Sequence, residues 1–127
     1  MQITKRFTFS AGHRLSTHTG LCANLHGHNF TLEVTVEGEI DIHTGMVIDF
    51  STMKKIVKEY LDIYDHALIL NSIDTTDIKI GRVIRLPFEP TVENMAEKFL
   101  MDLRGYDLNV IKIRLYETED SYAEVLH

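Results

Sequence analysis

Four segments of the chain alternate hydrophobic and polar residues with a period of two, the pattern of a strand with one buried face. The apolar side chains occupy odd positions in residues 2–9 and even positions in residues 29–37. Residues 109–117 repeat the alternation, and residues 121–127 carry a shorter version of it. We expect these segments to form antiparallel strands that each keep one solvated face.

Two other segments have the three- and four-residue spacing of amphipathic helices. The first runs from residue 50 to residue 64, about four turns, with Asp49 or Ser51 placed to cap its start. The second begins after Thr91, a candidate N-cap, and ends before Gly105, a candidate C′ residue.

The order of these elements predicts an α+β fold, an antiparallel four-stranded sheet with both helices on one face. Residues 71–90 are predicted to be a loop, with one short strand within residues 78–88. The other sheet face is polar, and its outer strands have unpaired edges. Such edges are removed when a barrel closes, and four strands close one only with strands of other subunits. We therefore expect a homo-oligomer.

Length and composition indicate one domain over residues 1–127, since 44% apolar and 25% charged residues suit a compact chain. A single cysteine excludes an intramolecular disulfide. No apolar run approaches the ~20 residues of a membrane span, and the N-terminus lacks a secretory signal. A cytoplasmic location is the expectation.

The net charge argues against two classes of partner. Thirteen basic and nineteen acidic residues give −6, and the basic residues are scattered along the chain. Nucleic acids and anionic membranes both require a concentrated basic surface, so we expect neither as a partner. A small-molecule substrate is the remaining expectation.

Three histidines near the N-terminus share one strand parity. His26 and His28 continue the apolar register of the second strand, and His13 continues that of the first. Their side chains are therefore expected on the helix side, with His26 and His28 roughly 7 Å apart at the backbone. Three neutral histidines with an open fourth position are the ligands of a catalytic zinc ion. The alternative is three separate, partly buried histidines that bond to backbone carbonyls.

Other candidate groups have both a structural and a chemical interpretation. Cys22 is either a small buried hydrophobic residue or, beside a metal, a thiolate base or nucleophile. His66 after Asp65 either complements a helix C-terminus or is a proton shuttle oriented by the carboxylate. Glu117, with Thr118 beside it, either lies at the solvent rim or accepts paired hydrogen bonds from a planar ligand.

These residues together resemble the 6-pyruvoyl-tetrahydropterin synthase and 6-carboxytetrahydropterin synthase family over nearly the whole chain. The matching motifs are Phe9-x-Ala11-x-His13, Cys22-x-x-x-His26-Gly27-His28, Asp49-Phe50, Asp65-His66, Pro90-Thr91-x-Glu93-Asn94 and Glu117-Thr118. The resemblance implies the tunnelling fold, in which sheets of several subunits join into a barrel with the helices outside. It also implies a hexamer of two stacked trimers.

The resemblance also implies roles for the candidate residues. The implied zinc ligands are His13, His26 and His28. Cys22 would be the catalytic thiolate, and Asp65 with His66 the proton relay, contributed by a neighbouring subunit. Glu117 would grip the amino-pyrimidine edge of a pterin with help from Thr118. The implied substrate is 7,8-dihydroneopterin triphosphate, whose side-chain hydroxyls zinc would hold while Cys22 and His66 move protons.

Spacing within the motif bears on the product. Three residues separate Cys22 from His26, as in the 6-carboxytetrahydropterin synthases of the 7-deazaguanine pathway to queuosine or archaeosine. A glutamate directly after the cysteine marks forms that replace the folate-pathway aldolase, and Ala23 argues against that activity. Residues 71–89 are longer than the family pattern. The resemblance therefore does not determine the rim of the pocket or the specificity for the substrate side chain.

We therefore expect a zinc-dependent carbon–carbon lyase that forms 6-carboxytetrahydropterin and releases acetaldehyde and triphosphate. The alternatives are a 6-pyruvoyl-tetrahydropterin synthase with the same site residues, a non-catalytic zinc- or pterin-binding oligomer, and a zinc hydrolase that would not need Cys22. The sequence singles out none of the basic residues that would bind the triphosphate. The candidates are Lys5, Arg14, Arg82 and Arg85.

Overall fold

The fold is a curved sheet covered on one face by two helices. A computed structural model describes residues 1–79 and 81–127. Its elements in chain order are β1 (Gln2–His13), the short 3-10 helix η1 (Leu21–Ala23), β2 (His26–Glu37), α1 (Phe50–Leu61), β3 (Ala67–Asn71), β4 (Arg82–Leu86), α2 (Val92–Arg104), β5 (Val110–Thr118) and β6 (Ser121–Leu126).

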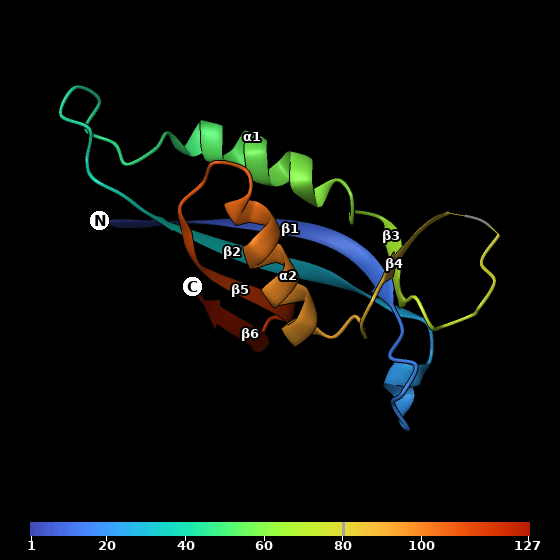
Figure 1. The fold of residues 1–127 in the computed structure, drawn as a ribbon. Coiled ribbons are helices and arrows are strands. Elements are labelled where there is room, and N and C mark those ends of the chain that lie inside the picture. The colour runs from blue at the N-terminus through green and yellow to red at the C-terminus, as the bar shows by residue number, and fades with distance from the viewer. Residues whose placement is uncertain (80) are drawn as a thin grey trace.

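The sheet is mixed and contains six described strands in the order β4-β3-β1-β2-β5-β6 (Figure 1). Its antiparallel part, β1-β2-β5-β6, is the predicted four-stranded sheet. The prediction that this is the whole sheet is wrong, because β3 pairs in parallel with the end of β1 and β4 pairs in parallel with β3. β3 escaped prediction because a short buried strand is a continuous apolar run without alternation. β4 lies within residues 78–88, where a short strand was expected, although residue 80 of that range is outside the described residues.

Both helices begin where their caps predict. Asp49 accepts a backbone N–H in the first turn of α1, and Thr91 does the same for α2. α1 ends with Asp62 as its C-cap, before the predicted residue 64. α2 ends directly before Gly105 as predicted, and this glycine is its C-cap, with φ −72°, instead of its C′ residue.

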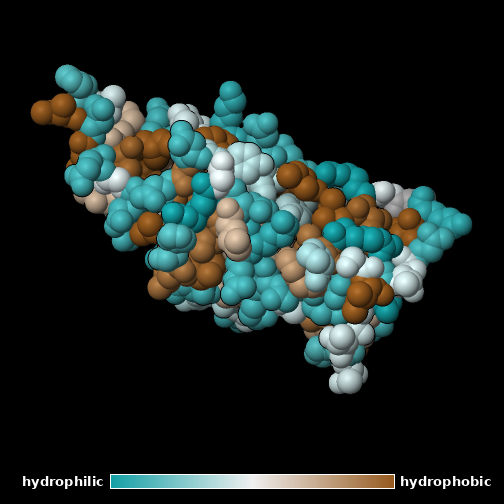
Figure 2. Space-filling view, in the orientation of Figure 1, coloured by the Kyte–Doolittle hydropathy of each residue, from teal (hydrophilic) through white to brown (hydrophobic). Residues whose placement is uncertain are grey.

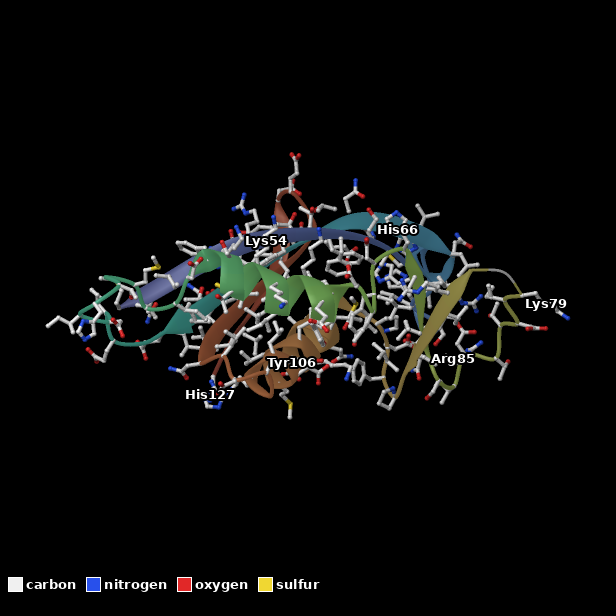
Figure 3. All side chains as sticks on the ribbon, turned by 90° about the horizontal axis from the view of Figure 1, so that it is seen from above. Lys54, His66, Lys79, Arg85, Tyr106 and His127 are labelled. Carbon is white, nitrogen blue, oxygen red and sulfur yellow. The ribbon has the colours of Figure 1, made fainter. Side chains whose placement is uncertain are left out.

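The connections on either side of α1 differ in how far they extend from the packed body. Between β2 and α1 the chain forms a projecting end that carries hydrophobic residues (Figure 2), and Ile40, Ile42 and Met46 are exposed there. After α1, a turn brings His66 beyond the C-terminal end of the helix, as the view from above shows (Figure 3). Neither described helix has the length and hydrophobicity required to cross a membrane.

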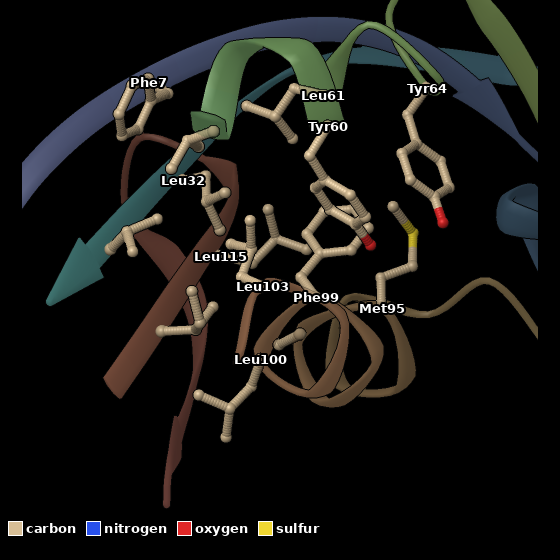
Figure 4. Close-up of a cluster of buried hydrophobic side chains, with 14 of the residues drawn as sticks. Phe7, Leu32, Tyr60, Leu61, Tyr64, Met95, Phe99, Leu100, Leu103 and Leu115 are labelled. Carbon is tan, nitrogen blue, oxygen red and sulfur yellow. The ribbon is translucent and has the colours of Figure 1, made fainter. Parts of the chain in front are cut away.

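The hydrophobic core lies between the sheet and both helices, which confirms that the helices share one face (Figure 4). Its largest contributors are Phe7, Phe9, Phe30, Leu32, Ile113 and Leu115 from the strands, and Met53, Tyr60, Met95, Phe99 and Leu103 from the helices. Tyr60 also donates a hydrogen bond to Asp102 Oδ2 at 2.6 Å, which joins α1 to α2. Burial raises the pKa of Tyr60, so its hydroxyl stays protonated as the donor.

Candidate metal centre

The three N-terminal histidines converge where β1 and β2 leave the core. His13 pairs with His26, and Ala11 pairs with His28, in the same register that places Phe9 opposite Phe30. The ring centroids lie 4.5 Å apart for His13 and His26, 5.1 Å for His13 and His28, and 5.0 Å for His26 and His28. The parity argument is confirmed, because no bulge interrupts the alternation between the core and the cluster.

Backbone carbonyls orient two of the rings. His13 Nδ1 lies 2.9 Å from the Pro90 carbonyl oxygen, and His26 Nδ1 lies 2.7 Å from that of Asn24. A carbonyl only accepts, so each Nδ1 carries the hydrogen and each Nε2 keeps its lone pair. Metal-binding histidines in proteins are held in this way.

His13 is the most buried member of the cluster, with 1% of its surface exposed. Its Nε2 has no hydrogen-bond partner among the described residues. A buried nitrogen without a partner indicates an ion or water at that point. Burial also lowers the pKa of His13, which favours the neutral imidazole that a metal requires.

Glu117 on β5 is the fourth member of the cluster. Its Oε1 lies 3.2 Å from His28 Nε2, yet His28 Nε2 makes no hydrogen bond of acceptable geometry within the described residues. The donor atoms of His13, His26, His28 and Glu117 all lie within 4.8 Å of one another. Three imidazole nitrogens beside one carboxylate oxygen suit a zinc ion, which takes four nitrogen, oxygen or sulfur ligands.

Cys22 lies in η1, on the loop that joins β1 to β2, and is partly buried. Its carbonyl oxygen accepts the Leu15 N–H at 2.9 Å. The same loop is tied to the start of α2, because the Glu89 carboxylate accepts the Ser16 N–H at 3.1 Å and also the Ser16 hydroxyl. Asn94 Nδ2 in turn donates to the Glu89 carbonyl at 3.0 Å. The cysteine loop is therefore positioned by the connection between β4 and α2.

Asp65 and His66 are fixed against β1 at Ser10. Asp65 Oδ1 accepts the Ser10 N–H at 2.9 Å and lies 3.1 Å from His66 Nδ1. The Ser10 N–H is the main cause that lowers the pKa of Asp65, with a contribution from His66. The His66 N–H donates back to the Ser10 carbonyl, and 79% of the His66 side chain is exposed. An ionised carboxylate thus orients an imidazole that faces outward.

Thr118 follows Glu117 on β5 but lines another surface of the chain. It lines a hollow of about 550 Å³ on the polar face of the sheet together with Thr8, Thr31 and Tyr116. Its hydroxyl donates to Asp120 Oδ1 at 3.0 Å. Glu117 and Thr118 therefore line different surfaces of this chain.

Three of the four basic candidates for phosphate binding are engaged within the chain. Arg14 Nε lies 3.1 Å from Asp74 Oδ2, and the other two arginines donate to backbone carbonyls. Arg82 donates to those of Asp62, Ile63 and Asp65, and Arg85 to those of Asp74 and Thr76. The Lys5 ammonium lies over the rings of Phe7 and Phe50, 5.8 and 6.0 Å from their centroids.

The sequence analysis allowed for histidines bonded to backbone carbonyls but did not identify which carbonyls these are, and it did not predict the Ser16–Glu89 contact. His13 and Pro90 lie 77 positions apart, so only the folded chain brings them together. The Pro90-Thr91 motif indicated where the connection between β4 and α2 ends. The motif does not indicate that the Pro90 carbonyl contacts a histidine.

Comparisons with known proteins show the family and the fold. Residues 2–127 match the family model described as 6-pyruvoyl tetrahydropterin synthase. The 6-carboxy-5,6,7,8-tetrahydropterin synthase of Haemophilus influenzae is 36% identical over 97% of this chain and 96% of its own. The solved structure of Caenorhabditis elegans 6-pyruvoyl tetrahydropterin synthase is similar with a TM-score of 0.79 and 25% identity, over 100% of this chain and 95% of its own. An uncharacterized protein from Wolinella succinogenes has the same fold, with a TM-score of 0.84 at 23% identity over 100% and 98% of the two chains.

Proposed function

The chain belongs to the 6-pyruvoyl tetrahydropterin synthase family, and from this membership we propose that it is a lyase that forms 6-carboxy-5,6,7,8-tetrahydropterin. The proposed substrate is 7,8-dihydroneopterin triphosphate, and the co-products are acetaldehyde and triphosphate. One water is consumed, because loss of triphosphate removes an oxygen that the two carbon products together require. The names of the curated relatives at 31–36% identity support the carboxylate product. The product would enter 7-deazaguanine synthesis, toward queuosine or archaeosine.

The convergence of His13, His26 and His28 is the observation that carries the proposal. With Nδ1 of His13 and His26 engaged by carbonyls, the Nε2 atoms are the free ligands of a zinc site. A zinc ion bound there supplies a Lewis acid for the substrate oxygens. The residues of the chain fit that group in type and number.

The remaining roles fall to side chains around the histidine cluster. Cys22 would remove a proton as a thiolate, and His66, oriented by Asp65, would carry protons to and from the substrate. Glu117 would accept hydrogen bonds from the amino-pyrimidine edge of the pterin, with Thr118 assisting. Because Glu117 and Thr118 line different surfaces of one chain and most of the His66 side chain is exposed, we propose that neighbouring subunits complete each site.

The open edge of β1 supports an assembly of that kind. β3 pairs only with Ala11–His13, and within the described residues no strand covers residues 2–9 on that side. The Ser10 N–H and carbonyl point to this side, so by alternation those of Thr4, Arg6 and Thr8 do as well.

β6 is the edge at the other end of the antiparallel part, and β6 runs opposite to β1. β6 of one copy can therefore extend the sheet of the next in antiparallel fashion and close a barrel. We propose the hexamer of two stacked trimers. Light scattering should then give six times the 14.6 kDa chain mass, and a monomeric mass would contradict this assembly.

Product analysis tests the proposed reaction. Zinc-loaded protein is incubated with 7,8-dihydroneopterin triphosphate, and the pterin product is identified by mass spectrometry alongside an assay for acetaldehyde. We expect 6-carboxytetrahydropterin and acetaldehyde, and neither product from the Cys22→Ala variant. A 6-pyruvoyl product would assign the chain to the other activity of the family. Untouched substrate would favour a non-catalytic binding role, and hydrolysis that survives Cys22→Ala would favour a zinc hydrolase.

A further inference from the structure

We propose that Arg82 is a positioning residue that fixes the turn carrying Asp65 and His66. The inference rests on the proposed role of these two residues as a proton relay. Arg82 begins β4, and its register partner on β3 is Ala67, the residue that directly follows His66. The long segment before α2 thus supplies a strand whose first side chain lies beside the relay.

The Arg82 guanidinium binds the backbone carbonyl of Asp62, the C-cap of α1, and two carbonyls of the turn that follows the helix. Nη1 donates to the Asp65 carbonyl at 3.0 Å, and Nη2 donates to those of Asp62 and Ile63 at 2.8 and 2.9 Å. The C-cap carbonyl of a helix lacks a partner within the helix, and a cation there also complements the helix dipole. The rigid fork of a guanidinium can bind several carbonyls at once, which an ammonium on a flexible stem does less well.

The turn needs this support because His66 has φ 59°, in the left-handed region that residues other than glycine rarely adopt. Such conformations persist only where surrounding contacts determine them. On one side the turn bonds to Ser10 through the Asp65 carboxylate and the His66 N–H. On the other side Arg82 binds its carbonyls, so the two sets of contacts together fix the His66 backbone.

This role differs from phosphate binding, the other role that the sequence allowed for Arg82. A phosphate ligand contributes to substrate binding, so its loss raises KM. A positioning residue changes the geometry of the reacting groups, so its loss lowers kcat. The two roles therefore separate in steady-state kinetics.

The test compares Arg82→Ala with Arg85→Ala, a control from the same strand that also removes an arginine bound to carbonyls. In Arg82→Ala we expect kcat to fall about 10- to 100-fold with KM unchanged. We also expect the His66 amide to exchange its hydrogen faster, whereas in Arg85→Ala that exchange stays as in the unmodified chain. Added guanidinium at non-denaturing concentration should restore part of kcat in Arg82→Ala.

Two results would overturn the inference: a raised KM with kcat unchanged, or unchanged values of both kcat and His66 amide exchange. If Arg82→Ala does not fold, Arg82→Lys takes its place, and an intermediate loss of kcat with intermediate amide exchange is expected. If the unmodified chain does not turn over the pterin substrate, the proposed function fails. The amide exchange of His66 then still decides whether Arg82 fixes the turn.

Discussion

His13 and His26 lie directly opposite each other on β1 and β2, with ring centroids 4.5 Å apart and each Nδ1 bound to a carbonyl from a different loop. The strand pairing sets the separation of the rings, and the two carbonyls set their rotation. The site is therefore preorganised by backbone atoms, and its metal affinity should depend on the histidines themselves.

Replacement of one histidine tests this directly. His28→Ala removes one of the three proposed histidine ligands and should abolish retention of stoichiometric zinc after dialysis, as measured by metal analysis. His43→Ala is the matched control, because His43 lies in the exposed segment between β2 and α1. Full zinc content in the His28 variant would remove His28 from the ligand set.

The strand parity that predicted this cluster needed only the sequence. Phe7, Phe9 and His13 share one face of β1, and alternation continues through the whole strand, so the position of His13 followed from that of the phenylalanines. The position of the Pro90 carbonyl did not follow, because it depends on how β4 and α2 pack against the end of β1. Local pattern thus predicts which histidines come together, and tertiary packing determines the orientation of their rings.

The mixed part of the sheet shows a second limit of sequence analysis. Residues 67–71 read Ala-Leu-Ile-Leu-Asn, a short apolar run that periodicity does not separate from a helix end. The φ of 59° at His66, which redirects the chain into this strand, has no signal in a histidine. The sequence therefore identified the Asp65-His66 pair but predicted neither the left-handed backbone at His66 nor the strand that follows it.

Burial of neutral His13 gives the metal-free protein a pH dependence. The folded-state pKa of His13 is lowered, mainly by burial, so the unfolded chain binds the extra proton first. Stability is then unaffected above the unfolded pKa of about 6.5 and falls as the pH drops below it. Denaturant unfolding with chelator present should show a lower midpoint at about pH 5.5 than at about pH 7.5. His13→Gln should reduce that difference, and an equal difference in both proteins would contradict the assignment.

A substitution of Glu117 distinguishes a role in pterin binding from a role in metal binding. Glu117→Gln keeps the shape of the side chain and removes the charge that strengthens its hydrogen bonds. We expect pterin binding to weaken by about 1.5 to 3 kcal/mol, measured by fluorescence titration, while zinc content stays unchanged. Loss of zinc would instead make Glu117 the fourth metal ligand, a role that its 3.2 Å separation from His28 Nε2 also allows.

The Glu89 contact with Ser16 should control the order of the cysteine loop. Glu89→Ala removes the acceptor of both the Ser16 N–H and its hydroxyl, at a cost of about 1.5 to 3 kcal/mol in unfolding free energy. We expect faster amide exchange in residues 14–25 and slower turnover. Glu93→Ala, an exposed residue in the first turn of α2, is the control. Unchanged exchange in the loop would show that Glu89 does not position it.

The most direct test of the account is the zinc ligand set, measured by X-ray absorption at the zinc edge of the loaded protein. The account predicts nitrogen and oxygen neighbours only, at about 2.0 to 2.2 Å, with three imidazoles from His13, His26 and His28. Cys22 would then remain free to act as a thiolate. A sulfur neighbour at about 2.3 Å would make Cys22 a metal ligand and contradict its proposed role.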